Sequence, residues 1–316
     1  MSIFHEYYAP KSFIDRYSDD PKDAVDVIIP VIHVNELWEE NLSSFYREIP
    51  INRLLIGDGG CIDDTITIAK KFPRVEIFDH RSFTSLGFSI RKLIESVETK
   101  WFIYLHSDVY LPEGWYNIMI KHQGEFDWFQ CRQRMTALIE LDVYDESDYL
   151  RRAYSGSQMG RKEAFEKVLP QIDDDYLYRN EDIILAHLIE KAGYKYGHAS
   201  DAFHYHQTMY KPSKWKRQIA KIEFQVETSP EEELRTNMMN VKGIIKYMQP
   251  SPLALEAVRF GSNRLIELNQ MTWRDFYQWV EETNPSWLPL ITKEVKKKKF
   301  KEFVQRIIQR IAKIIK

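Results

Sequence analysis

The stretch VDVIIPV, at residues 25–31, decides the fold class of this chain. It is almost continuously apolar and rich in β-branched side chains, which is typical of a strand in a parallel sheet with both faces covered. The next apolar run, RLLI at 53–56, follows after a segment with apolar residues spaced for one helical face. A strand, a covering helix and a second strand predict an α/β fold.

The same alternation continues to residue 105. We predict further strands at 75–78 and 101–105, and helices at 36–47, 65–72 and 85–97. Strands that alternate with helices in this way predict a doubly wound, mostly parallel sheet.

Beyond Trp115 the pattern is less regular. From about residue 212 the pattern is helical to the end of the chain, with charged interruptions. Before that point we predict strands at 127–131 and 137–141, a loop over 155–160 that enters a helix near Arg161, a helix at 183–192, and extended segments at 194–198 and 202–206.

Composition limits the function classes. The chain has 316 residues, 44% hydrophobic and 29% charged, which is ordinary for a folded soluble protein. Cys61 and Cys131 are far apart without CxxC spacing, so we expect no disulfide framework, no zinc site and a reducing compartment. The first residues lack a signal-peptide pattern, and no apolar run reaches the roughly 18 residues of a spanning helix, so we expect neither secretion nor a membrane span.

Candidate functional residues follow the predicted strands. Open parallel sheets bind ligands beyond the carboxyl ends of their strands. Strand 25–31 contains Pro30 and leads to Glu36, strand 53–56 leads to Asp58 between glycines, and strand 101–105 leads to Asp108. Asp108 would serve a diphosphate through a divalent cation, because two anions repel each other directly.

Six segments together resemble the family-2 glycosyltransferases with the GT-A fold. The resemblance extends over about residues 25–210. The segments are VDVIIPVIHVNELWEENLSSF, LLIGDGG, SLGFSIRKLI, WFIYLHSDVYLPEGW, SGSQMGRKEAFEKV and NEDIILAHLIEKAGY. The order and spacing of these motifs carry the resemblance, which implies an α/β fold of GT-A type with a C-terminal helical extension.

The resemblance also implies a role for individual residues. Asp108 corresponds to the last acid of the family's DxD motif and would bind the metal, and His206, or less favourably His204, corresponds to a late histidine ligand. Asp182 corresponds to the catalytic base, with Glu181 beside it. The implied nucleotide-binding residues are Pro30, Glu36, Asp58 and Gly87.

Three residues depart from the family pattern. Gly57 and His33 stand where an acid and an asparagine are usual, and His106 replaces the first aspartate of DxD. A site with one carboxylate, a histidine and phosphate oxygens remains able to bind Mn²⁺ or Mg²⁺. Imidazole suits Mn²⁺ better than Mg²⁺.

Each assignment has a simpler interpretation. Asp58 between glycines is also typical of a turn, and Glu181 and Asp182 also suit the first turn of a helix. His204 and His206 alternate on one strand, so both face the same side, where histidines are often merely packed. The strand-end position of Asp58 and the order of the motifs favour the functional interpretation.

The segment 293–316 is a basic amphipathic pattern. It contains ten Lys or Arg and two Glu, a local net charge of +8, and its bulky apolar residues recur at helical spacing. This pattern is typical of an in-plane helix on an anionic membrane surface, although a terminal helix docked on the body has the same spacing. Nucleic acid is not an expected partner, since no stacking aromatics accompany the charge.

The leading hypothesis is an inverting, metal-dependent hexosyltransferase. It would act at the cytoplasmic face of the cell membrane, as a peripheral protein, on a lipid-linked or glycan acceptor, with a UDP-sugar favoured over a GDP-sugar as donor. The alternative is a catalytically inactive GT-A protein that binds a nucleotide or a partner. A third option, a sugar-1-phosphate nucleotidyltransferase, would need a Gly-rich loop that is missing after the first strand.

We predict a lead-in at 1–24, the GT-A domain at 25–211, a helical segment at 212–292 and the membrane helix at 293–316.

Overall fold

The computed structural model consists of two compact units, Met1–Ser229 and Pro230–Lys316. The division falls inside the predicted helical segment 212–292. The structure describes residues 13–18, 21–32, 34, 37–82, 86–135, 156–172, 181–207, 241–250, 254–255, 258, 262, 266 and 271–291.

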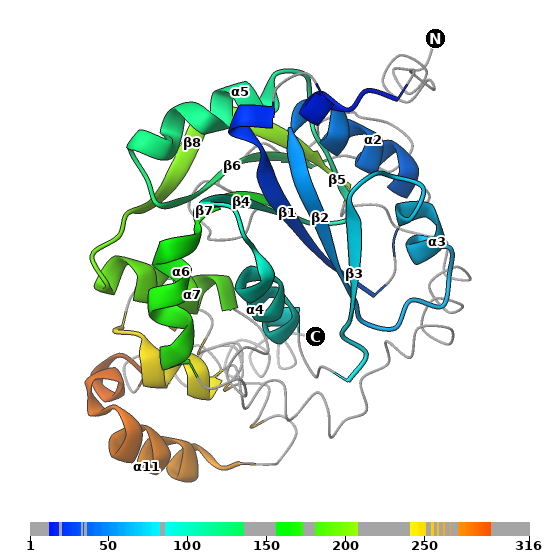
Figure 1. Ribbon diagram of the computed structural model, residues 1–316. Helices are drawn as coiled ribbons and strands as arrows, with labels where there is room; N and C mark the ends of the chain where they lie inside the picture. Colours follow the sequence, from blue (N-terminus) through cyan, green and yellow to red (C-terminus); the bar gives the residue numbers. More distant parts are fainter. Residues whose placement is uncertain are drawn as a thin grey trace, which may run out of the picture. The chain divides into compact units, whose positions relative to one another are not determined.

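The first unit is built on one eight-stranded sheet with the order β3-β2-β1-β4-β7-β6-β8-β5 (Figure 1). Starting from β1, strands β2 and β3 are added in turn toward one edge of the sheet. The chain then returns to the other side of β1, where it forms β4, as in a doubly wound sheet. The strands are β1 Val25–Val31, β2 Ile51–Asp58, β3 Val75–Asp79, β4 Trp101–Leu105, β5 Val109–Tyr110, β6 Trp128–Met135, β7 Ser157–Arg161 and β8 Tyr196–His206.

The predicted strands of the first half are confirmed. β3, β2, β1 and β4 are all parallel, with Val27 opposite Leu54 on one side and Ile103 on the other. β6 and β8 also pair parallel, whereas β7 and β5 run antiparallel to their neighbours. The sheet is therefore mostly parallel, as predicted.

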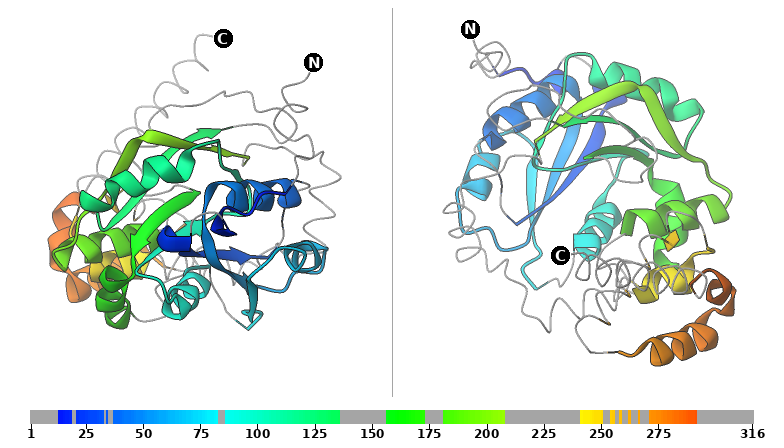
Figure 2. Two further views of the ribbon diagram at one scale, coloured as in Figure 1. Left: turned by 45° about the horizontal axis from the view of Figure 1, so that its top comes forward. Right: turned by 180° about the vertical axis from the view of Figure 1, so that it is seen from behind.

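Helices cover both faces of this sheet, which explains the continuous apolar run at 25–31 (Figures 1 and 2). Val27, Ile29 and other alternate residues of β1 share a core with α2, and Ile28 is equally buried on the opposite side, where α4 packs against β1. The helices of this unit are α2 Trp38–Glu48, α3 Thr65–Ala69, α4 Leu86–Ser96, α5 Trp115–Met119, α6 Lys162–Val168 and α7 Glu181–Lys191, with 3₁₀ turns at Arg16–Ser18, Pro21–Asp23, Ile120–Gly124 and Leu169–Gln171.

The predicted loop at 155–160 is wrong, because β7 occupies residues 157–161 between β4 and β6. Polar Ser157 and Gln158 hide the strand pattern, yet both are buried and paired: Ser157 with His204, and Gln158 with the Trp128 indole at 3.0 Å. The two predicted segments at 194–198 and 202–206 form one strand, β8, whose register with β6 shifts after Cys131. The predicted strand at 137–141 lies outside the described residues.

In the second unit, α11 (Trp273–Thr283) begins with a capping box, in which Thr272 and Asp275 satisfy each other's backbone N–H groups. Its Phe276 and Val280 are buried, and Trp287, in the 3₁₀ turn Pro285–Trp287, donates its indole N–H to Met248 O. The predicted helical character is seen in these residues. No described helix is long and apolar enough to cross a membrane, and residues 293–316 lie outside the described part of the chain.

Candidate metal and nucleotide site

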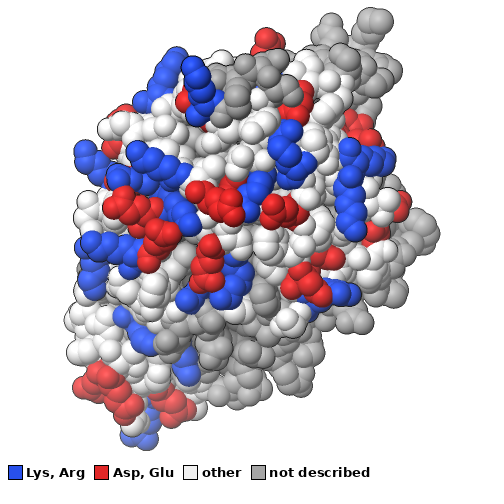
Figure 3. Space-filling model, viewed as in Figure 1, with Lys and Arg blue, Asp and Glu red and all other residues white. Residues whose placement is uncertain are grey.

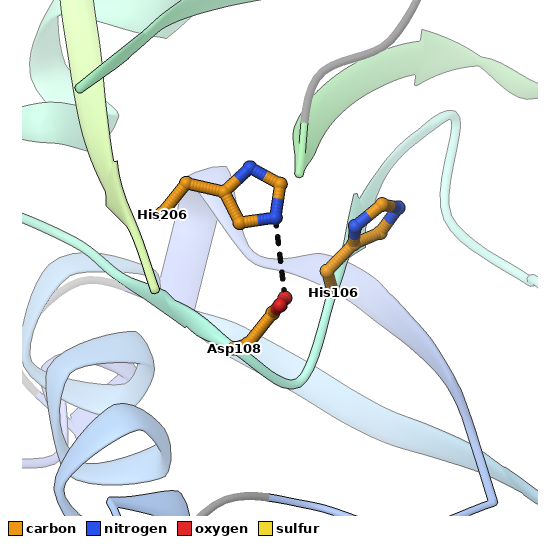
Figure 4. A group of neighbouring side chains, drawn as sticks. All are labelled: His106, Asp108 and His206. Atoms are coloured by element: carbon orange, nitrogen blue, oxygen red, sulfur yellow. Dashed lines mark ion pairs between the residues drawn. The ribbon is translucent and has the colours of Figure 1, made fainter. Parts of the chain in front are cut away.

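The ends of β4 and β8 bring three potential metal ligands together. The chain leaves β4 through His106 and Ser107 to Asp108, and the following β5 pairs antiparallel with β8, with Val109 opposite His206. His106, Asp108 and His206 each offer one ligand atom, and these atoms all lie within 4.8 Å of one another (Figure 4). Among the described residues this His-Asp-His group is the one cluster of its kind.

His206 is buried and oriented by two neighbours. Its Nδ1 lies 2.8 Å from Gln133 Oε1, an acceptor, so Nδ1 carries a proton. Its Nε2 lies 3.3 Å from Asp108 Oδ1 (dashed in Figure 4) and has no hydrogen-bond partner among the described residues. A carboxylate oxygen that faces an imidazole nitrogen requires a positive charge between them, which either a proton on Nε2 or a metal ion supplies.

Burial and neighbouring charge set the protonation states of Asp108 and His106. Burial would raise the pKa of the Asp108 carboxyl, but the adjacent His206 outweighs it and holds the pKa below its usual value. Burial, together with the nearby His206, lowers the pKa of His106 to about 4. Near neutral pH Asp108 is therefore ionised and His106 is neutral, which are the forms that bind metal ions.

The Asn41 side chain and the Gln207 backbone hold the turn that carries the group. The Asn41 amide, on α2, donates to Ser107 O at 2.9 Å and to Gln207 Oε1 at 3.1 Å. The backbone N–H of Gln207 donates to Asp108 O at 2.9 Å. The turn between β4 and β5 is thus tied both to α2 and to the residue that follows β8.

His204 lies on the same face of β8 as His206, as the alternation predicts, with ring centroids 5.3 Å apart. It is fully buried, its Nδ1 lies 2.7 Å from Ser157 Oγ and 3.3 Å from Cys131 Sγ, and it is not part of the His-Asp-His group. Burial, with His206 and His106 adding to it, lowers the pKa of His204 well below its usual value. His204 is therefore neutral near pH 7, and its buried Nε2, like that of His206, has no hydrogen bond among the described residues.

Asp58 lies at the same sheet edge, in register with Val31 of β1 and Asp79 of β3. Its Oδ1 accepts from the N–H groups of Gly60 and Cys61, so the turn role is present in the structure. Parallel strands end together, and the carboxyl ends of β1, β2 and β4 therefore form one edge, the expected place for a nucleotide.

The glycine at position 57 has a packing reason. A Cβ there would lie 2.5 Å from His80 Nδ1 and 2.7 Å from Ser89 Oγ, which bond each other at 2.6 Å. This buried pair excludes the acid that the resembling family usually has. Of the other predicted nucleotide-binding residues, Pro30 pairs with Gly57, Gly87 is buried in the first turn of α4, and Glu36, like His33, lies outside the described residues.

The predicted base is placed apart from the His-Asp-His group. α7 begins at Glu181, and Asp182 in its first turn is buried but does not belong to that group. Burial, and then the charge of Asp182, raises the pKa of Tyr196 at the opposite end of β8 from His206. The structure thus brings Asp108, His106 and His206 together and places Asp182 at another position around the sheet.

Charged side chains are mixed on the face shown in Figure 3. Lys and Arg alternate with Asp and Glu across the described residues of this face, and neither sign forms a continuous field there. The described part of this face therefore offers no broad basic surface.

Comparison with known proteins gives structural matches. No family model and no curated protein sequence matches the chain. S. aureus TarS 1–349 in complex with UDP-GlcNAc is similar, with a TM-score of 0.50, 13% identity, and 80% of this chain and 78% of that chain covered. The mannosyltransferase PcManGT from Pyrobaculum calidifontis, in complex with GDP-Man and Mn²⁺, matches with a TM-score of 0.46 and 12% identity over 92% of this chain and 85% of that chain. The TarS comparison shows a likeness of fold, and the chain has a GT-A-like α/β fold, as predicted.

Proposed function

We propose that this protein is a glycosyltransferase that transfers a sugar from a nucleotide-sugar donor, with a divalent cation held by Asp108 and His206. The observation that carries the proposal is the His-Asp-His group at the carboxyl edge of a GT-A-like sheet. The similarity to a TarS structure that holds UDP-GlcNAc supports a UDP-sugar over a GDP-sugar as donor.

The residues fit a divalent cation. The His206 Nε2 is buried without a hydrogen-bond partner among the described residues and faces Asp108 Oδ1 at 3.3 Å, a separation that two ligands of one ion can have. A bound cation would neutralise charge on the leaving diphosphate. Because imidazole is a better ligand for Mn²⁺ than for Mg²⁺, we favour Mn²⁺.

The side chains then have separate roles in transfer. Asp58 would contact the ribose or base, with Pro30, Glu36 and Gly87 beside the nucleotide. Asp182 would accept the proton of the attacking hydroxyl while the sugar carbon bonds to that oxygen and releases the nucleoside diphosphate. A single displacement of this kind inverts the anomeric centre. Asp182 lies in the first turn of α7, where the positive end of the helix dipole stabilises a carboxylate.

The acceptor and the location rest on the sequence of 293–316. Its local charge of +8 and its apolar helical spacing support peripheral binding to anionic lipid on the inner face of the cell membrane. We therefore propose a lipid-linked or glycan acceptor, a catalytic domain at 25–211 and a connecting helical segment at 212–292.

The test is donor hydrolysis or transfer with Mn²⁺ across a panel of nucleotide sugars, for the wild type, Asp108→Ala and Asp182→Ala. We expect turnover in the wild type and a large loss in both variants. Turnover at the wild-type rate in both variants would refute the assigned site.

A second candidate is a GT-A protein that binds nucleotide without turnover. It is favoured by His106, which leaves the group with one carboxylate, and by the position of Asp182 outside that group. Tight nucleotide binding with no turnover across the whole donor panel would support this candidate over the enzyme.

A further inference from the structure

We infer that His106 is a third protein ligand, so that His106, Asp108 and His206 form a centre of two imidazoles and one carboxylate that selects a transition-metal ion over Mg²⁺. This centre would select the ion of the proposed site. Only the role of that ion, which is to bind the donor diphosphate, rests on the proposed function.

The first step is the spacing of the three ligand atoms. Bonds from such ions to nitrogen and carboxylate oxygen are about 2.0–2.2 Å, so two ligands of one ion lie roughly 3–4 Å apart. The 3.3 Å between Asp108 Oδ1 and His206 Nε2 already has this value. The whole group spans at most 4.8 Å, so His106 reaches the same ion after a shift of about 1 Å.

The second step is the approach of the two rings. The imidazoles of His106 and His206 have centroids 5.5 Å apart and planes at 72°, with Asp108 between them in Figure 4. Two rings that are tilted in this way direct nitrogens toward a common point from different sides. Packed aromatic rings also adopt this edge-to-face tilt, so the distances among the three ligand atoms, and not the angle between the rings, carry the inference.

The third step is preorganisation. The hydrogen bond to Gln133 leaves the His206 Nε2 as the coordinating nitrogen, and this buried atom faces Asp108 Oδ1 and has no hydrogen bond among the described residues. Asn41 holds the Ser107 carbonyl, which restrains the turn that carries both His106 and Asp108. Metal-binding histidines usually have such an outer partner on the second nitrogen.

The fourth step is the choice of ion. Mg²⁺ prefers an octahedral set of oxygens and keeps several waters, whereas imidazole suits the transition metals, whose affinity rises from Mn²⁺ through Fe²⁺ to Co²⁺. Two nitrogens in a set of three protein ligands therefore act against Mg²⁺. An aspartate at position 106 would give two carboxylates and restore a site suited to Mg²⁺.

The experiment measures binding rather than turnover. Full-length protein is stripped of metal and titrated with Mn²⁺, alone and with UDP, while EPR follows the free ion; Mg²⁺ and Co²⁺ are then added as competitors. Pulsed EPR of the bound Mn²⁺ detects coupling to coordinated ¹⁴N. The variants are His106→Asp and His106→Gln, and the control is His122→Gln, which removes a histidine that pairs with Asp201 away from the group.

We expect two coupled nitrogens in the wild type, with Mg²⁺ competing at least roughly tenfold more weakly than Mn²⁺ and Co²⁺ more strongly. His106→Asp should lose one nitrogen and bind Mg²⁺ more tightly, His106→Gln should lose one nitrogen without gaining Mg²⁺, and His122→Gln should behave as the wild type. Either histidine variant suffices if the other does not fold, as judged by circular dichroism.

The inference is overturned if no Mn²⁺ binds in either titration, if Mg²⁺ competes equally, or if the ¹⁴N coupling is unchanged in the His106 variants. Two outcomes distinguish failure of the three-ligand centre from failure of the proposed function. Two coupled nitrogens without sugar transfer would leave the centre standing and refute the transferase. Sugar transfer with Mg²⁺ and no ¹⁴N coupling from His106 would support the transferase and refute the three-ligand centre.

Discussion

Asp108 Oδ1 lies 3.3 Å from His206 Nε2, and the antiparallel pairing of β5 with β8 holds them there. Val109 is opposite His206, and the Gln207 N–H bonds the Asp108 carbonyl. Two residues far apart in the sequence are thus placed by backbone hydrogen bonds on both sides of the pair. The contact is a feature of the sheet, so the backbone positions persist when either side chain is replaced.

Replacing His206 and His204 separately distinguishes a metal ligand from a packing residue. We expect His206→Gln to weaken Mn²⁺ binding by roughly tenfold or more, because the nitrogen that faces Asp108 is lost. His204→Gln should leave Mn²⁺ affinity close to the wild type but lower the free energy of unfolding by about 1–3 kcal/mol, since His204 bonds buried Ser157. Mn²⁺ titration and urea denaturation measure the two effects, and an equal loss of Mn²⁺ affinity in both variants contradicts the assignment.

The strands of the first half are predictable because burial on both faces leaves a continuous apolar signal. Val25–Val31 and Trp101–Leu105 show it plainly. β7 is not predictable in this way, because its Ser157 and Gln158 are polar residues in a buried strand. Their hydrogen-bond partners are buried side chains of β8 and β6. The local sequence pattern does not show that a residue is hydrogen-bonded to a strand far away in the sequence.

The same limit applies to the site. Asp108 and His206 were predicted through resemblance and strand-end position, and the structure places them side by side. No local sequence pattern identifies Gln133 or Asn41. The role of Gln133 depends on the pairing of β6 with β8, and that of Asn41 on the packing of α2 against the turn at Ser107. His106 was predicted only as a departure from the DxD motif, and the position of its ligand atom within 4.8 Å of those of Asp108 and His206 makes it a candidate ligand.

Gln133 should control the metal affinity of His206 without touching the ion. Gln133→Leu removes the acceptor for His206 Nδ1–H, so the ring loses its orientation, and we expect Mn²⁺ affinity to fall by about 10- to 100-fold. Gln133→Glu keeps an acceptor and should retain affinity. The matched control is Gln130→Leu on the same strand, whose amide lies 3.2 Å from His198 Nδ1 outside the His-Asp-His group. Wild-type Mn²⁺ affinity in Gln133→Leu would show that the hydrogen bond does not orient the ligand.

Gly57 should tolerate no side chain. An alanine Cβ would lie 2.5 Å from His80 Nδ1 and 2.7 Å from Ser89 Oγ, both buried, so we expect Gly57→Ala to lower the free energy of unfolding by about 1–3 kcal/mol. At Gly124 an added Cβ meets no atom of the described residues within 4 Å, which makes Gly124→Ala the matched control, with a much smaller change. Urea denaturation compares the two. If His80 is the obstacle, Gly57→Ala in a His80→Ala background should destabilise less, and equal stability of the two glycine variants would contradict the steric argument.

Asp26 should make stability depend on pH in the acid range. Its side chain is fully buried and accepts from Arg53 Nη2 at 2.6 Å, Asn52 Nδ2 at 2.8 Å and the Glu98 N–H at 2.7 Å. Burial alone would raise the pKa of this carboxyl, but these donors outweigh it and the pKa is lowered. Because the folded pKa is below the unfolded value of about 3.9, the stabilisation is complete above about pH 4 and is lost as the pH falls toward the folded pKa.

Asp26→Asn should therefore lower the free energy of unfolding by about 3 kcal/mol at pH 7, because Arg53 is left without its buried partner. The difference from the wild type should shrink below about pH 4, as the wild-type carboxyl takes up a proton and loses the same interaction. Urea denaturation at pH 7, 5, 4 and 3 measures it. Asp79→Asn is the control, since Asp79 pairs with Arg81 in an exposed contact that solvent screens, and it should change stability far less. A difference between Asp26→Asn and the wild type that stays constant across this range would mean that the introduced amide, and not the loss of the negative charge, destabilises the variant.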